Sequence, residues 1–178
     1  MQAIAEHIKL QSGQKILIQG GSGGIGVFAT ALAKHLGAYV ATTVSGASAD
    51  YANEIGADEV IDYKTQDFST ILSDYDAVFD LVGSEVYEKS FKVLKKGGIL
   101  VSTVAQANNE LADTHGVTTL TQQTMVNTRR LNELAKLVQD GVIKVKIDSI
   151  FPLAQISQAF IKQESGGVRG KVVVEVKK

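Results

Sequence analysis

A glycine-rich turn between an apolar strand and an amphipathic helix constrains this sequence most. The strand is predicted over residues 15–20, which read KILIQG, and the helix over residues 24–36, where apolar residues recur at spacings of three and four. Between them, Gly21, Gly23 and Gly26 match the pattern G-x-G-x-x-G. In that pattern the first glycine makes a tight turn, the second lets the backbone approach an anion, and the third lets the helix pack closely. The turn therefore predicts amides that face a bound diphosphate at a helix N-terminus.

Short apolar runs alternate with stretches of helical periodicity along the rest of the chain. Further helices are predicted over residues 49–55 and 84–94. Further strands are predicted over residues 38–44, 59–62, 77–83, 97–103 and 117–126. Nearly continuous apolar strands are typical of a parallel sheet that is covered on both faces. The pattern predicts an α/β fold, a Rossmann doubly wound parallel sheet of order 3-2-1-4-5-6 with helices on both faces.

The C-terminal part of the chain follows a different pattern. We expect residues 1–140 to form a dinucleotide-binding (Rossmann) domain, because a chain of this length can bury a full core. Residues 141–178 are expected to form a C-terminal tail. It contains the only proline, Pro152, a short helix over 153–162 and an apolar strand over 171–176.

Composition excludes several classes of function. The 18 basic and 19 acidic residues are interspersed, so no basic stripe predicts a nucleic-acid partner. The absence of cysteine excludes disulfides and thiolate zinc sites, and the three histidines lie far apart, so no metal site is expected. No apolar run approaches the roughly 20 residues that span a bilayer, and no signal peptide is evident. We therefore expect a cytoplasmic protein with no membrane partner.

The end of the second strand bears on the choice of cofactor. NAD-specific domains place an acidic residue there, whereas Thr43 and Ser45 stand in that region here. A carboxylate would repel a 2′-phosphate, so its absence favours NADP(H). Asp50, in the first turn of the next predicted helix, keeps NAD(H) as an alternative. No Lys or Arg lies between Lys34 and Lys64 to neutralise a 2′-phosphate.

Five segments together resemble the zinc-free quinone oxidoreductase branch of the medium-chain dehydrogenase/reductase superfamily. They read QSGQKILIQGGSGGIG, GADEVIDY, YDAVFDLVG, LKKGGILVST and GVRGKVVVEV. The resemblance covers almost the whole chain and implies a cofactor-binding domain with its C-terminal tail. In relatives a barrel-like N-terminal catalytic lobe precedes this domain, and the tail from about Val142 packs on it. The resemblance thus implies part of a longer enzyme, without that lobe.

The resemblance also implies which residues bind the cofactor. Positions that match the pyrophosphate loop are Ser22, Gly23, Gly24 and Ile25. Ser45 and Tyr63 match the 2′-phosphate site, although many relatives carry a lysine in the stretch that reads SGASA here. The nicotinamide half would lie along Leu81, Val82, Thr103 and Val104. With Gly21, Gly26 and Thr43, these residues form the predicted cofactor site.

The implied activity is zinc-independent hydride transfer from NADPH to a quinone or an activated alkene or carbonyl. The cofactor would supply the hydride and the missing lobe would select the substrate, so this chain alone is expected to be an inactive domain with no catalytic residue identified. Asp80 is expected to anchor neighbouring backbone rather than act as an acid or base. Two copies could pair as a homodimer through the edge strand over 117–126.

Two alternatives remain. A stand-alone dinucleotide-binding module could act in redox sensing or as a scaffold without catalysis, since fold does not fix function. A short-chain dehydrogenase is the lesser alternative. That class needs a tyrosine followed four residues later by a lysine, and none of the five tyrosines here has one.

Overall fold

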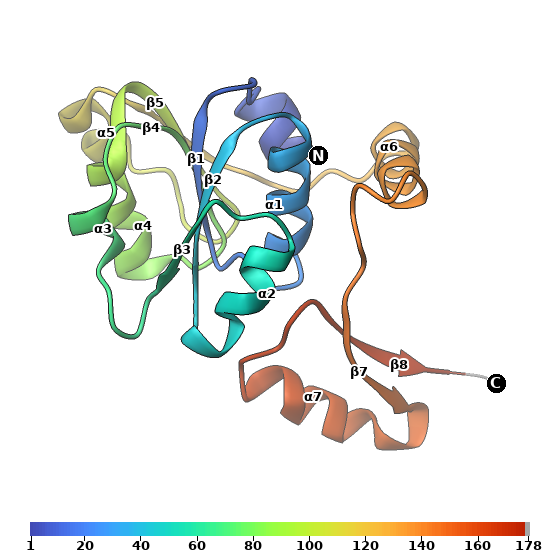
Figure 1. Cartoon of the computed structure of the whole chain (residues 1–178). Helices are drawn as coiled ribbons and strands as arrows, with labels where there is room; N and C mark the ends of the chain where they lie inside the picture. Colours follow the sequence, from blue (N-terminus) through green and yellow to red (C-terminus); the bar gives the residue numbers. More distant parts are fainter. Residues whose placement is uncertain (177–178) are drawn as a thin grey trace.

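Two parallel sheets of unequal size make up the protein, for which the computed structural model describes residues 1–176 (Figure 1). The larger sheet has the strand order β3-β2-β1-β4-β5-β6. All of its neighbouring strands are parallel. The strands are β1 (Lys15–Gln19), β2 (Tyr39–Val44), β3 (Glu59–Asp62), β4 (Tyr75–Asp80), β5 (Leu94–Ser102) and β6 (Thr118–Thr121). The predicted α/β fold class, a Rossmann sheet of order 3-2-1-4-5-6, is confirmed.

Helices cover both faces of this sheet (Figure 1). On one side lie the π-helical segment η1 (Gln2–His7), α1 (Gly26–His35) and, further out, α6 (Thr128–Gln139). On the other side lie α3 (Phe68–Ile71), α4 (Ser84–Ser90), the 3-10 turn η3 (Phe91–Val93) and α5 (Asn109–His115). The 3-10 turn η2 (Gly46–Ser48) and α2 (Ala49–Glu54) connect β2 to β3. No helix within residues 1–176 combines the length and apolar character needed to cross a membrane.

The core consists of two clusters, one on each face of the sheet. Successive side chains of a strand point to opposite faces. Ile16 and Ile18 therefore pack in one cluster with Leu32 of α1, while Leu17 packs in the other with Phe91. All five of these side chains are nearly or fully buried. Burial on both faces explains why β1 reads as a continuous apolar run.

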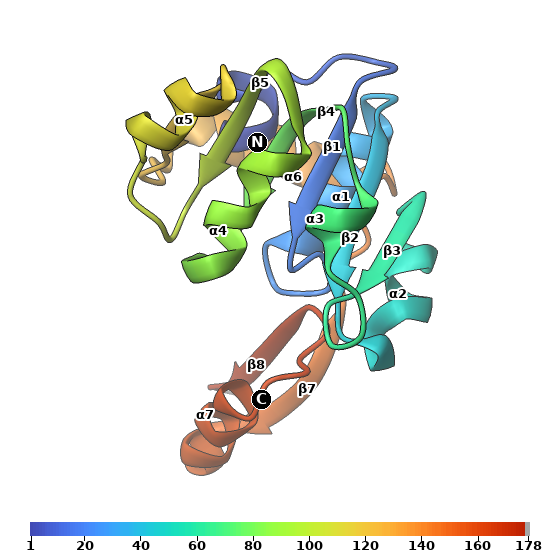
Figure 2. The same cartoon turned by 90° about the vertical axis from the view of Figure 1, so that its left-hand side faces the viewer.

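The C-terminal segment forms a unit of its own below the large sheet in Figure 2. It contains β7 (Ile147–Pro152), the 3-10 turn η4 (Leu153–Gln155), α7 (Ile156–Glu164) and β8 (Lys171–Glu175). The two strands pair in parallel, with Ile150 opposite Val173. The helix and the last strand lie close to their predicted positions, whereas β7 was not predicted. The domain boundary at residue 140 stays a prediction.

Several elements differ from the sequence-based expectation. The predicted helix over 24–36 begins only at Gly26, and the predicted strand over 117–126 is ordered as a strand only over Thr118–Thr121. The helices α3, α5 and α6 were missed. Each of them has a capping side chain that sequence reasoning could have used: Asp67 accepts from the amide of Ser69, Asn108 from that of Leu111, and Asn127 from that of Arg130.

An ion-pair cluster ties the N-terminal segment η1 to α6. One oxygen of Glu6 accepts from Arg129 at 2.7 Å and from Nε of Arg130 at 2.9 Å, and the other accepts from Arg130 at 2.5 Å. The hydrogen bonds from the Arg130 guanidinium lower the pKa of the Glu6 carboxyl to about 2. The cluster therefore links two segments that are more than a hundred residues apart, as the pair Glu6 and Arg130 is separated by 124 positions.

We predict that this cluster makes stability depend on pH. A carboxyl whose pKa is lowered on folding stabilises the protein above its unfolded-state value, and the stabilisation is lost as the pH falls through the folded-state value. The difference in melting temperature between the native protein and Glu6→Gln should therefore be constant above about pH 5 and shrink between about pH 4.5 and pH 2. Thermal unfolding followed by circular dichroism measures it. A difference that is the same at pH 6 and pH 3 would contradict the prediction.

Candidate functional site

A cavity of about 870 Å³ opens at the carboxyl ends of β1, β2 and β4. Gln19, Val44 and Leu81, which end or directly follow these strands, are among its lining residues. In the sheet, β1 lies between β2 and β4, so the connections run in opposite directions from this point. Ligands of doubly wound sheets bind in the crevice at such a switch point. The fold thus places the cavity at its natural binding position.

The glycine-rich turn forms one wall of the cavity. At Gly21 and Gly26 the surrounding atoms leave no room for a side chain. A Cβ atom on Gly26 would lie 2.2 Å from the carbonyl oxygen of Gly20, and one on Gly21 would lie 1.9 Å from Oγ1 of Thr42. The left-handed backbone of the turn is at Gly20, with φ +75°. Gly21 is instead needed for close contact with β2. It does not line the cavity.

A buried polar network holds the turn against the end of β2. Oγ1 of Thr43 donates to Oε1 of Gln19 at 2.6 Å and accepts from the amide of Gly20 at 3.2 Å. Nε2 of Gln19 donates to Oγ of Ser90 on α4 at 3.2 Å. Thr43, predicted as a cofactor residue, lines the cavity, but its hydroxyl is committed to the protein. Sequence reasoning missed Gln19, whose polar side chain in an otherwise apolar strand was the available signal.

Asp80 fixes the loop at the opposite wall. It is fully buried, and its Oδ1 accepts from the amides of Val82 and Gly83, each at 3.0 Å. Its Oδ2 accepts from Oγ of Ser102 at 2.7 Å. The Ser102 hydroxyl also accepts hydrogen bonds from two backbone amides in the loop that follows β5. The expectation that Asp80 anchors neighbouring backbone is confirmed, and its carboxylate ties together the loops after β4 and β5.

The structure brings most of the predicted cofactor residues to one cavity. Those that line it are Ser22, Gly23, Gly24, Ile25, Gly26, Thr43, Ser45, Tyr63, Leu81 and Val82. Thr103 instead lines a second cavity of about 220 Å³ beside the N-terminal segment. Val104 lies outside both linings, with its Cγ2 3.2 Å from the position of a Cβ on Gly83.

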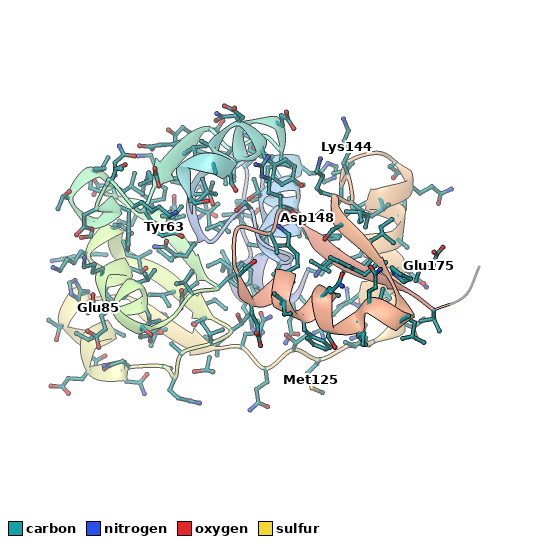
Figure 3. The ribbon with its side chains drawn as sticks, turned by 90° about the horizontal axis from the view of Figure 1, so that it is seen from below. Tyr63, Glu85, Met125, Lys144, Asp148 and Glu175 are labelled. Carbon is teal, nitrogen blue, oxygen red and sulfur yellow. The ribbon has the colours of Figure 1, made fainter. Side chains whose placement is uncertain are left out.

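Charged side chains cluster around the cavity. Lys89 of α4 pairs with Asp67 at 2.8 Å, and hydrogen bonds from Lys89 and Ser69 lower the pKa of the Asp67 carboxyl to about 2. Glu85, in the first turn of α4, and Lys64, after β3, also line the cavity. Figure 3 looks onto this end of the molecule and shows Tyr63 and Glu85 on the core, well away from Glu175 of β8.

The C-terminal unit contributes to the same cavity. The amide of Gly170 donates a hydrogen bond to the carbonyl of Ser22 in the glycine-rich turn, at 3.0 Å. Within the C-terminal unit, the amide of Lys171 donates to the carbonyl of Lys146, also at 3.0 Å. The Lys171 side chain crosses the glycine-rich turn, so its Nζ lies 2.8 Å from the position of a Cβ on Gly24. No salt bridge within residues 1–176 engages this ammonium group. A positive charge therefore stands over the exposed turn.

Sheet order, switch-point cavity and glycine-rich turn together define a Rossmann-type domain. Residues 55–174 match the family model described as zinc-binding dehydrogenase. The chain is 31% identical over 188 residues to the chloroplastic quinone-oxidoreductase QR1 of Triphysaria versicolor, covering 97% of this chain and 57% of that protein.

Solved structures agree with this assignment. The quinone oxidoreductase of Coxiella burnetii superposes with a TM-score of 0.92 at 32% identity, over 98% of this chain and 56% of that one. The mycobacterial protein Rv1454c, solved in complex with NADPH, gives a TM-score of 0.89 at 26% identity, over 98% and 60%. The chain belongs to the zinc-binding dehydrogenase family of the medium-chain dehydrogenase/reductase superfamily. It spans about half the length of the curated relatives it matches.

Proposed function

We propose that this chain is the NADP(H)-binding domain of a zinc-independent oxidoreductase that transfers a hydride from NADPH to a quinone or an activated alkene or carbonyl. The observation that carries the proposal is the turn at Ser22–Gly24, which lines the switch-point cavity beneath the ammonium group of Lys171. Backbone amides at such a turn, next to a helix N-terminus, are suited to a diphosphate. The NADPH in the structure of Rv1454c supports the choice of cofactor.

The lining residues fit the parts of a dinucleotide. Amides of Ser22, Gly23 and Gly24 would hold the pyrophosphate. The adenosine ribose would lie beside Ser45 and Tyr63, where no carboxylate at the end of β2 opposes a 2′-phosphate. The apolar side chains of Leu81 and Val82 would exclude water along the nicotinamide half. When bound, the cofactor supplies the hydride, while this chain binds and orients it.

Substrate selection is proposed to reside in a further lobe that packs on the C-terminal unit, residues 141–178. Large apolar side chains of β7 and α7 support this, because Ile150, Phe160 and Ile161 are each more than 60% exposed. The relatives' greater length provides a segment to cover them. Zinc independence is proposed because the sequence contains no cysteine and because no three potential metal-binding side chains come together within residues 1–176. We also propose that two copies of the chain pair as a homodimer through the edge strand β6.

Calorimetric titration with NADPH and NADH tests the proposed function. We expect saturable binding of NADPH with a stoichiometry of one, and tighter binding of NADPH than of NADH. With NADPH and a soluble quinone, the chain alone should give little loss of absorbance at the NADPH band. If the chain binds neither NADPH nor NADH, the cofactor assignment is refuted. Turnover comparable to that of a complete reductase would refute the need for a further lobe.

We predict that Lys171 strengthens binding of the pyrophosphate. Lys171→Met keeps most of the alkyl chain over Gly24 but removes the charge, so the Kd for NADPH and for ADP-ribose should rise about tenfold. Lys171→Arg should retain most of the affinity. Lys144→Met is the matched control, because Lys144 belongs to the same C-terminal segment but lies outside the cavity lining (Figure 3). Calorimetry at low and high salt measures the effect, and an unchanged Kd in Lys171→Met would contradict it.

A further inference from the structure

The ends of β2 and β3 form one compact end of the cavity. The amide of Tyr63 donates to the carbonyl of Val44 at 3.1 Å, which holds the residues after β3 beside those after β2. Gly46 packs so closely on the Asp62 carboxylate that a Cβ on Gly46 would lie 2.5 Å from Oδ2 of Asp62. Ser45, Tyr63 and Lys64 all line the cavity here. Two hydroxyls and one ammonium group are thus available to a ligand at this end.

Lys64 differs from the other lining cation of the core in having no carboxylate partner. Lys89 is neutralised by Asp67 at 2.8 Å, whereas no salt bridge in the part of the chain that the structure describes engages Lys64. Its amide donates to Oδ1 of Asp62 at 3.1 Å, which fixes the backbone while the side chain stays exposed. Asp62 itself does not line the cavity. Lys64 therefore presents an ammonium group to the cavity at this end without a carboxylate of residues 1–176 paired to it.

We propose that Lys64 is the residue that recognises the 2′-phosphate of NADP(H) and sets the preference over NAD(H). The inference rests on the proposed function, that this cavity holds a nicotinamide dinucleotide. A phosphate dianion beside Ser45 and Tyr63 would accept hydrogen bonds from both hydroxyls and pair with the ammonium group of Lys64. The segment after β2 contains no cation, and the turn after β3 supplies one instead. A flexible lysine at an exposed site acts as a point charge here, so its effect is expected to be moderate.

The test compares ligands that differ only in the 2′-phosphate. Lys64→Met should raise the Kd for NADPH and for adenosine 2′-phosphate about tenfold and leave the Kd for NADH and ADP-ribose within about twofold. Lys64→Glu should reverse the preference, so that NADH binds more tightly than NADPH. Lys64→Arg should retain it. The matched control Lys144→Met should leave every Kd unchanged, and thermal unfolding checks that all variants are folded.

The outcomes separate this inference from the function on which it rests. If the native protein binds neither NADPH nor NADH, the proposed function fails. If it binds both, and Lys64→Met leaves the ratio of their Kd values within about twofold of the native ratio, the assignment of Lys64 is overturned while the function stands. An equal loss of affinity for NADPH and NADH would overturn it as well, because Lys64 would then act on a shared part of the cofactor.

Discussion

Gly26→Ala is expected to lower the free energy of unfolding by about 3 kcal/mol, at the upper end of what overpacking costs. The added methyl group would lie 2.2 Å from the carbonyl oxygen of Gly20 and 2.6 Å from Cα of Gly21. Both atoms are backbone, so no side chain can rotate away and the turn itself must move. Urea unfolding followed by circular dichroism measures the loss.

The same variant is expected to lose affinity for NADPH by about a hundredfold, because displacing the turn misaligns the amides of Ser22–Gly24 that would hold the pyrophosphate. Gly24→Ala is the matched control for stability. Its Cβ would lie 2.8 Å from Nζ at the flexible end of the Lys171 side chain and 3.1 Å from the carbonyl oxygen of Gly170, which is a milder approach to backbone than at Gly26. We expect it to stay within about 1 kcal/mol of the native protein. Equal stability of Gly26→Ala and the native protein would show that the turn adapts without strain.

Local patterns were sufficient to predict the sheet. Most of the strands contain a short apolar run, with β6 (TTLT) as the exception, and the order follows from right-handed crossovers and the glycine-rich fingerprint. β7 was missed because its sequence, IDSIFP, mixes exposed and half-buried positions and ends in proline. β7 pairs only with β8, in a sheet of two strands. It therefore lacks the burial and the apolar composition of a central strand.

Sequence patterns indicate where residues of the cavity lie when the local backbone determines their position, but not when segments distant in the chain meet. The glycine-rich turn was located from the spacing of its glycines between a predicted strand and a predicted helix. The approach of Lys171 to Gly24 joins positions that are far apart in the chain, and no local pattern indicates it. Thr103 was expected on the cofactor path, yet it follows β5 and faces the second cavity next to the N-terminal segment.

Replacing Asp80 by alanine is expected to lower the free energy of unfolding by about 3 kcal/mol. The carboxylate is fully buried and accepts three hydrogen bonds, two from the amides of Val82 and Gly83 at 3.0 Å and one from Ser102 at 2.7 Å. Truncation leaves these donors without their partner and creates a cavity. Because the amides belong to the cavity wall at Val82, affinity for NADPH should fall as well.

Two further variants, Asp80→Asn and Ser102→Ala, test which feature of Asp80 stabilises the protein. One possibility is its charge, and the other is the hydrogen bonds by which it connects the loops after β4 and β5. The asparagine oxygen can still accept from the two amides, but its NH2 group would point at Oγ of Ser102. That oxygen already accepts from the amides of Val104 at 3.2 Å and Ala105 at 2.9 Å. We therefore expect the free energy of unfolding of Asp80→Asn to lie between those of the native protein and Asp80→Ala.

The double variant Asp80→Ala/Ser102→Ala tests the connection between the loops. Its loss of unfolding free energy should be clearly smaller than the sum of the losses in the two single variants, since residues in one network are coupled. Additive costs would mean that the loops after β4 and β5 are held independently, and that the carboxylate does not connect them.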